Sequence, residues 1–304
     1  MPDFNSLICD IKKALPESKI LEREPMSRHC SFRIGGAARL MVTVRSEAEL
    51  GILLGMLKDT DLPPFFIGNG TNLLWTDEES SYCVIKAGDG FSDLSQGLDN
   101  TIICGSRVSL ARLALFAAGL GLSGLEFAHG IPGTLGGGIF MNAGAYGSCL
   151  SDVITEVRSL DSEGKAVIRS GDELAFSYRS SVYCSNLEFI CSAKIRLMPG
   201  NKAEILELMD SLYEKRSSSQ PLDMPSAGST FKRPEGDFAG RLIDAAGLRG
   251  YKIGGAMVSD KHAGFVVNTG AASFSDVINL MEHIKKSVFD NFGVELSPEV
   301  RIVR

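Results

Sequence analysis

The sequence lacks the cysteine and histidine patterns of a disulfide framework or a metal site. Its seven cysteines are odd in number and form no CxxC pair, which favours free thiols in a reducing compartment. Most are expected to be small core residues, because free cysteine is usually buried. The four histidines show neither HExxH nor another ligand spacing, so no metal site is predicted.

Long apolar runs and basic runs are also missing. No apolar stretch reaches the roughly 18 residues that a membrane span needs. The first residues, Met1 to Asn5, lack the basic flank and apolar core of a signal peptide. Lys and Arg number 31 against 37 Asp and Glu, with no basic run that could follow a phosphate backbone. We therefore expect a soluble, cytoplasmic protein with no nucleic acid, membrane or obligate protein partner.

The chain contains enough apolar residues for two lobes. It has 304 residues, of which 44% are hydrophobic, and this length exceeds the usual single-domain size. An alternating run at 189–197 ends at Pro199-Gly200, after which helical spacing resumes at Ile205. The domain boundary is therefore predicted between 199 and 200, with a further division of the first lobe near 75–85.

Caps and periodicity predict the principal helices and strands. Helices are expected after Ser46, from Ser109 to a left-handed turn at Gly119, and from a cap at Ser275 to Gly293. Strands are expected at 40–44, 65–67 and 83–86. The Ser-, Pro- and Gly-rich stretch from Ser217 to Ser229 is expected to be a loop.

A first glycine loop follows the predicted strand at 65–67. Two glycines, Gly68 and Gly70, stand among Asn69, Thr71 and Asn72, so successive backbone N–H groups could hold a pyrophosphate. The loop fails the Rossmann pattern because Leu73 replaces the third glycine. A bare tight turn is the alternative explanation of the glycines.

A second loop is denser in glycine, with five glycines in the nine residues from Gly130 to Gly138. So many glycines allow the backbone to approach a flat or anionic ligand closely, although tight packing within a sheet is an alternative explanation. Ile139 follows Gly138 where a Walker loop needs Lys. Two glycine loops of neither standard type indicate a large cofactor containing a diphosphate.

The order of several motifs resembles the UDP-N-acetylenolpyruvoylglucosamine reductase (MurB) family. Eight motifs carry this resemblance across nearly the whole chain: Cys30–Gly36, Gly68–Leu74, Gly130–Thr134, Ser177–Ser181, Pro225–Pro234, Ala239–Leu248, Lys261–Asn268 and Pro298–Val300. The short spacing between Tyr178 and Pro199 is similar to that of the shorter, second type of the family.

The resemblance implies an α+β fold and a set of functional residues. The expected fold is an FAD-binding lobe of the vanillyl-alcohol-oxidase (PCMH) type, made of two subdomains, covering 1–199, and a smaller substrate-binding lobe covering 200–304. The implied cofactors are FAD and NADPH, and the implied substrate is UDP-N-acetylglucosamine enolpyruvate. The expected cofactor-binding residues are Gly68, Asn69, Gly70, Thr71, Asn72, Leu73, Gly130, Ile131, Pro132, Gly133, Thr134, Gly136, Gly137, Asn142, Ala143 and Gly144.

The resemblance also assigns three catalytic roles. Arg179 is expected against the substrate carboxylate, Ser229 as the proton donor, and Glu299 as the group that polarises the enol or orients the donor. Tyr178, Lys232 and Arg241 are candidates for substrate contact. Taken alone, each catalytic residue would more often be an ordinary surface or turn residue.

Two rival functions and three departures accompany this interpretation. The rivals are an FAD-dependent alcohol or hydroxy-acid oxidoreductase of the same cofactor fold and a nucleotide-sugar-binding regulator without turnover.

The departures from the family pattern are His129, Ser219 and Ser297. We expect the first to alter flavin packing and the second to weaken contact with the substrate diphosphate.

Overall fold

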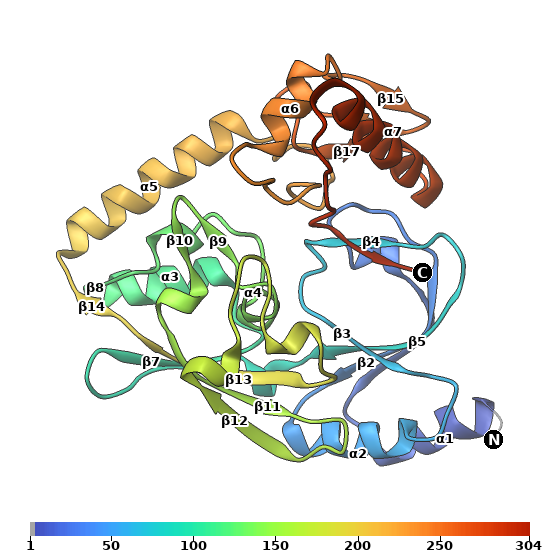
Figure 1. The fold of residues 1–304 in the computed structure, drawn as a ribbon. Coiled ribbons are helices and arrows are strands. Elements are labelled where there is room, and N and C mark those ends of the chain that lie inside the picture. Colours follow the sequence, from blue (N-terminus) through green and yellow to red (C-terminus); the bar gives the residue numbers. More distant parts are fainter. Residues whose placement is uncertain (1–3) are drawn as a thin grey trace. The chain divides into compact units, whose positions relative to one another are not determined.

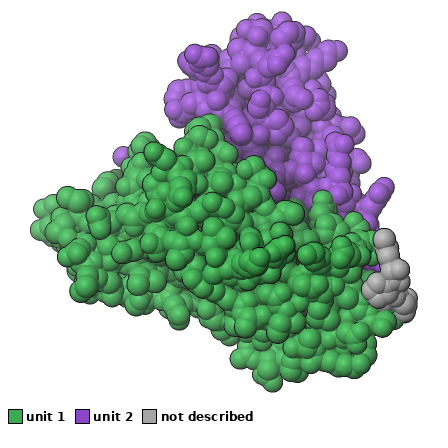
Figure 2. Space-filling model, turned by 60° about the horizontal axis from the view of Figure 1, so that its bottom comes forward, with its two compact units in different colours: residues 1–22, 40–68, 81–214 green, residues 23–39, 69–80, 215–304 purple. Residues whose placement is uncertain are grey.

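A computed structural model describes residues 4–304. The expectation that the amino terminus is no signal peptide rests partly on Met1, Pro2 and Asp3, which lie outside the described residues. The chain divides into two compact units, coloured separately in Figure 2. Unit 1 comprises the described part of 1–22 together with 40–68 and 81–214, and unit 2 comprises 23–39, 69–80 and 215–304. Each unit is described by itself.

The first sheet belongs mostly to unit 1 and has the strand order β1-β2-β5-β3. Its strands are β1 (Lys19–Pro25), β2 (Ala37–Val44), β3 (Pro64–Ile67) and β5 (Ser80–Ala87), and β3 runs parallel to β5. Two helices, α1 (Phe4–Ala14) and α2 (Glu47–Leu57), contact each other beside this sheet (Figure 1). Leucines at helical spacing on α2 are buried in the core that the helices and sheet share.

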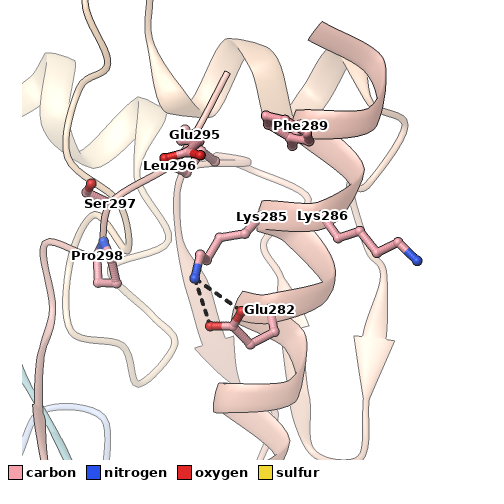
Figure 3. Close-up of a pocket in the computed structure, with 8 residues that line it drawn as sticks. All are labelled: Glu282, Lys285, Lys286, Phe289, Glu295, Leu296, Ser297 and Pro298. Atoms are coloured by element: carbon pink, nitrogen blue, oxygen red, sulfur yellow. Dashed lines mark hydrogen bonds and ion pairs between the residues drawn. The ribbon is translucent and has the colours of Figure 1, made fainter. Parts of the chain in front are cut away.

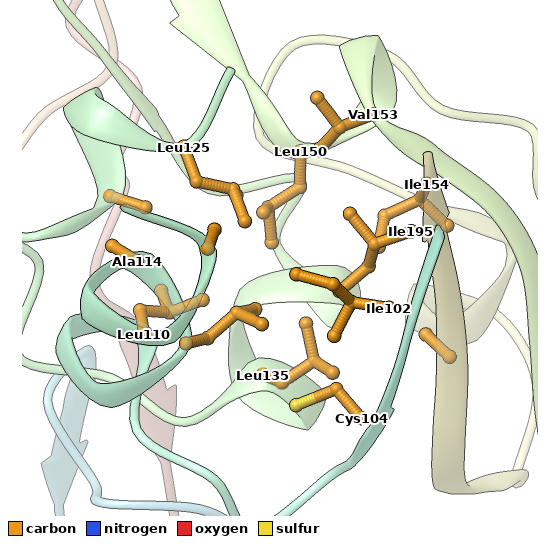
Figure 4. Close-up of a cluster of buried hydrophobic side chains, with 14 of the residues drawn as sticks. Ile102, Cys104, Leu110, Ala114, Leu125, Leu135, Leu150, Val153, Ile154 and Ile195 are labelled. Atoms are coloured by element: carbon orange, nitrogen blue, oxygen red, sulfur yellow. The ribbon is translucent and has the colours of Figure 1, made fainter. Parts of the chain in front are cut away.

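The second sheet of unit 1 is antiparallel, with the order β12-β11-β13-β7-β6. Its strands are β6 (Leu94–Gln96), β7 (Thr101–Gly105), β11 (Ile154–Leu160), β12 (Ala166–Ser170) and β13 (Phe189–Arg196). Helices α3 (Leu110–Gly119) and α4 (Leu135–Phe140) pack with it through a second apolar core. Leu110, Leu135, Ile102 and Ile195 point into this core from both helices and two strands (Figure 4).

Short strand pairs complete unit 1. Strand β8 (Leu122–Ser123) pairs with β14 (Met198–Pro199), and β9 (Gly144–Ala145) pairs with β10 (Ser148–Cys149). The long helix α5 (Lys202–Ser219) begins in unit 1 and ends in unit 2.

Unit 2 has a three-stranded antiparallel sheet and a separate parallel strand pair. The sheet has the order β15 (Lys252–Ile253), β16 (Ala256–Val258), β17 (Val266–Asn268). Helices α6 (Ala239–Ala245) and α7 (Phe274–Phe292) share one apolar core with it. Strand β18 (Arg301–Val303) runs parallel to β4 (Leu73–Trp75), so the end of the chain lies beside the segment after the first glycine loop.

The helix ends agree with the sequence at Ser46, Ser109 and Gly293, the left-handed C-cap of α7, and differ at three other places. Ser46 and Ser109 are N-caps, each accepting from the backbone N–H three residues later, as predicted. The left-handed turn after α3 is at Gly121 and not at Gly119. The cap of α7 is Ser273 and not Ser275, because Ser273 forms a capping box with Asp276. Helix α5 includes Ser217 to Ser219, so the predicted loop begins later.

The two compact units divide the chain within α5, at 214/215. Unit 2 also takes in 23–39 and 69–80, since Phe32, Ile34 and Leu74 are buried in the same core as α6 and α7. The expected functional division of the lobes stays a prediction. No helix among residues 4–304 is both long and apolar enough to cross a membrane.

Candidate functional site

The two glycine loops meet in unit 1 through Gly68 and Thr134. A Cβ added to Gly68 would lie 2.5 Å from Thr134 Oγ1, so only glycine allows this approach. Thr134 is the N-cap of α4, and its Oγ1 accepts from the N–H of Gly137 at 3.4 Å. The predicted cofactor residues Gly68, Thr134 and Gly137 therefore form one close-packed cluster.

Ser106 adds an unpaired hydroxyl to this cluster. It is 5% exposed, and its Oγ has no hydrogen-bond partner among residues 4–304. Its carbonyl accepts from the N–H of Gly136 at 2.9 Å, and a Cβ at Gly136 would lie 3.0 Å from Ser106 Cβ. A buried hydroxyl without a partner costs free energy, so the cluster offers a polar group for a ligand. No sequence signal marked Ser106, because a serine after Gly105 resembles an ordinary turn.

Arg179 lies in a tight turn of unit 1. Ser177 and Ser180 exchange two backbone hydrogen bonds, of 3.1 and 3.2 Å, so that Tyr178 and Arg179 occupy the two central positions. Arg179 has a φ of 56°, which glycine normally provides at the second central position of such a turn. Its Nη2 donates to the carbonyl oxygen of Gly144 at 3.0 Å. The predicted catalytic arginine is thus joined to the predicted cofactor loop.

Asn142 joins the same two segments from within the loop. It is 5% exposed, and its Nδ2 donates to Ser177 O at 3.1 Å and Ser151 Oγ at 3.3 Å. Its Oδ1 accepts from the N–H of Ser151 at 2.9 Å. Both amide donors are therefore engaged with protein groups.

Ser229 and Glu299 belong to paired segments of unit 2. Phe231 and Pro298 form an antiparallel bridge, and the N–H of Glu299 donates to Thr230 O at 2.9 Å. Asn72 Nδ2 donates to Glu299 O at 3.1 Å, while Asn72 O accepts from Arg301 N at 3.0 Å. The structure therefore brings together the segments that carry the predicted proton donor and the predicted carboxyl group.

The predicted substrate-contact residues lie in both units. Tyr178, in unit 1, is 53% exposed. Lys232, in unit 2, donates its backbone N–H to Ser297 O at 2.8 Å, next to the Ser229 segment. Arg241 is the third residue of α6. It forms an i,i+4 ion pair with Asp237, whose Oδ1 is 2.6 Å from Arg241 Nε. This pairing lowers the pKa of the Asp237 carboxyl to about 2. The two residues are four positions apart, a spacing that favours an ion pair and can be recognised in the sequence.

A pocket of about 530 Å³ opens in unit 2 between α7 and the segment before Glu299. Lys285 points toward that segment and pairs with Glu282 at 3.0 Å, whereas Lys286 points away (Figure 3). Glu295 and Ser297 also line it. None of the predicted cofactor, substrate or catalytic residues lines this pocket.

The three departures from the family pattern lie at three separate places, and the buried His129 Nδ1 has no hydrogen-bond partner among residues 4–304. His129 directly precedes Gly130 in the sequence, and its ring lies 5.9 Å from the Tyr213 ring. Ser219 ends α5 and donates from Oγ to Lys215 O at 2.7 Å. Ser297 lines the pocket described above. Their effects on flavin packing and diphosphate contact stay predictions.

Two family models match the chain. Residues 38–169 match an FAD-binding domain, and residues 220–303 match the C-terminal domain of UDP-N-acetylenolpyruvoylglucosamine reductase. The α+β fold with an FAD-binding domain and a distinct C-terminal domain is thereby confirmed.

Similar proteins agree with these matches. A UDP-N-acetylenolpyruvoylglucosamine reductase from Caldanaerobacter subterraneus subsp. tengcongensis is 47% identical over 297 residues, covering 98% of each chain. The crystal structure of the same enzyme (MurB) from Thermus caldophilus has a TM-score of 0.81 and 32% identity, covering 95% of this chain and 99% of that one. A berberine bridge enzyme variant, at 14% identity and a TM-score of 0.50, shares the fold over 64% of this chain and 44% of its own.

The resemblance inferred from the ordered motifs is confirmed by full-length relatives and by both domains. The chain belongs to the UDP-N-acetylenolpyruvoylglucosamine reductase family and is an FAD-binding oxidoreductase.

Proposed function

We propose that this chain reduces the enolpyruvyl group of UDP-N-acetylglucosamine enolpyruvate to UDP-N-acetylmuramate, using electrons from NADPH, in cytoplasmic peptidoglycan synthesis. The observation that carries the proposal is the pairing of the Ser229 and Glu299 segments, held by Asn72. This pairing places a hydroxyl-bearing and a carboxyl-bearing residue on adjacent backbone segments in a family whose relatives are named for this reduction.

The residues of the glycine cluster fit a large phosphate-containing cofactor. Glycine is required at Gly68 by the nearness of Thr134, and Ser106 Oγ is a buried polar group without a partner in the described part of the chain. We propose that the residues from Gly68 to Leu73 and from Gly130 to Gly144 named above hold FAD, Asn142 through its backbone because its amide donors bond protein groups, and that Ser106 contributes its hydroxyl. When bound, FAD supplies hydride chemistry that protein side chains lack.

Arg179 is proposed to bind the substrate carboxylate. Its planar guanidinium matches two carboxylate oxygens, and its fixed charge counters the negative charge that develops on the carboxylate as hydride reaches the alkene. The left-handed backbone and the bond to Gly144 O hold the arginine in one orientation. A pre-oriented charge does not have to reorganise during the reaction.

Ser229 is proposed to donate a proton to the ether-bearing carbon after hydride arrives. A serine hydroxyl is a weak acid, so it must be held in place to serve a strongly basic carbanion. Glu299 is proposed to polarise the enol or to orient that hydroxyl. Tyr178, Lys232 and Arg241 are proposed to contact the rest of the nucleotide sugar, the two cations facing its diphosphate.

One assay tests the reaction as a whole. The purified protein is reduced anaerobically with NADPH until the yellow flavin colour is bleached, and UDP-N-acetylglucosamine enolpyruvate is then added. Return of the colour only with this compound, together with formation of UDP-N-acetylmuramate, is expected. Rapid return of colour with air and none with the sugar would instead favour an oxidase of the same cofactor fold.

A further inference from the structure

The Ser177–Ser180 turn is held at two points by the loop from Asn142 to Gly144. Asn142 Nδ2 donates to the carbonyl of Ser177 at 3.1 Å, and the carbonyl of Gly144 accepts from Arg179 Nη2 at 3.0 Å. One contact fixes the first residue of the turn, and the other fixes the end of the arginine side chain. Together the two contacts fix the position of the Arg179 backbone and the orientation of its guanidinium.

The turn needs this support because its backbone conformation is unfavourable. A φ of 56° at Arg179 costs about 1–2 kcal/mol for a residue with a Cβ, and such conformations persist only where surrounding contacts impose them. Asn142 itself has a φ of 42°, which asparagine tolerates better than most residues. Its amide is fixed in turn by two bonds to Ser151.

We propose that Asn142 is a positioning residue whose side chain holds Arg179 in its reactive orientation. The proposal rests on the catalytic role of Arg179 proposed above. The Nδ2 donor to Ser177 O keeps the turn closed, and Oδ1 anchors the amide to Ser151 N. Asn142 therefore acts on the substrate carboxylate through Arg179 and touches neither substrate nor reacting atoms with its amide donors.

Asn142→Asp tests this role because it replaces only the donor. The introduced carboxylate can still accept from Ser151 N, but it repels Ser177 O. We expect flavin content and flavin reduction by NADPH to stay within about twofold of the parent. Reoxidation by the enolpyruvyl substrate should slow by on the order of 10²-fold, as expected for a misplaced catalytic group.

The matched control is Asn268→Asp. Asn268 is also 5% exposed, donates from Nδ2 to a backbone carbonyl, Phe32 O, at 3.1 Å, and accepts from backbone N–H groups. Its replacement should destabilise the protein to a similar degree. If both variants slow both half-reactions equally, Asn142 has only a structural role and the proposal is overturned.

A double-mutant cycle with Arg179→Lys separates this proposal from the role of Arg179. Reoxidation should be slow in Arg179→Lys, and adding Asn142→Asp should slow it by less than about threefold more, because coupled residues are not additive. Full additivity would overturn the positioning role. No effect of Arg179→Lys alone would instead overturn the catalytic role. If Asn142→Asp does not fold, Asn142→Gly, which adopts a positive φ readily, replaces it in the same cycle.

Discussion

Arg179 donates from Nη2 to the carbonyl oxygen of Gly144 at 3.0 Å while its backbone stays in the left-handed region. The chain thus keeps a charged side chain at a turn position where glycine would be more stable. Backbone strain of this kind is commonly retained at functional sites. The predicted catalytic arginine and the predicted cofactor loop are parts of one hydrogen-bonded structure.

The strain at Arg179 predicts an unusual order of stability. Arg179→Gly should be more stable than Arg179→Ala by about 1–2 kcal/mol, because only the alanine variant keeps a Cβ at positive φ. The free energy of unfolding in urea, measured on the apoprotein, gives this difference. At Arg196, in strand β13, the same pair of substitutions should favour alanine by about 0.5–1 kcal/mol. The same order at both positions would argue against strain at Arg179.

The unpaired hydroxyl of Ser106 predicts opposite effects on stability and on cofactor binding. Ser106→Ala should make the apoprotein more stable, since a buried hydroxyl without a partner is removed. The same variant should bind FAD about three- to tenfold more weakly, which corresponds to the loss of one hydrogen bond. Thermal melting and flavin fluorescence titration measure the two effects.

Ser109→Ala provides the control for this experiment. It removes the N-cap of α3 and should lower the stability of the apoprotein by about 1 kcal/mol. If Ser106→Ala binds FAD as tightly as the parent protein does, Ser106 does not contribute to FAD binding.

His262 predicts how the stability of the protein depends on pH. Burial lowers the pKa of its imidazole below the ordinary value, and the charge of Arg249 adds to this effect. Its Nδ1 accepts from the N–H of Gly264 at 3.1 Å, which only an unprotonated nitrogen can do. The unfolded chain therefore binds the proton more readily, so stability is full above the unfolded pKa of about 6.5 and falls as the pH drops below it.

His262→Gln should remove this part of the pH dependence. The midpoint of urea unfolding, followed from about pH 7.5 to pH 5.5, should fall less steeply in the variant than in the parent. Identical slopes would show that His262 does not contribute.

Local sequence signals predicted the elements that depend on local contacts. Ser46 and Ser109 were identified as caps because each hydroxyl accepts from a backbone N–H only three residues later. Ser275 was preferred to Ser273 wrongly, since both stand before the same apolar spacing and the bond between Ser273 and Asp276 decides between them. Helix α5 continues through the three serines and ends at Ser219, because Ser218 and Ser219 donate back to Lys215 O within the helix.

Long-range pairings could not be predicted from the residues alone. Asn72 holds Glu299 across 227 positions, and Asn142 reaches Ser177 across 35. Nothing in the local sequence indicates which distant carbonyl an asparagine will meet. The motifs identified the candidate site residues through the family resemblance, and the structure supplied the contacts that orient them.

The role of Ser229 is the most direct test of the proposed mechanism. Ser229→Ala is reduced anaerobically by NADPH in a stopped-flow instrument and then mixed with UDP-N-acetylglucosamine enolpyruvate. The mechanism predicts an unchanged rate of flavin reduction and a reoxidation rate lower by about 10²- to 10⁴-fold, the usual contribution of a positioned proton donor. Equal losses in the two half-reactions, or reoxidation at the parent rate, would contradict it.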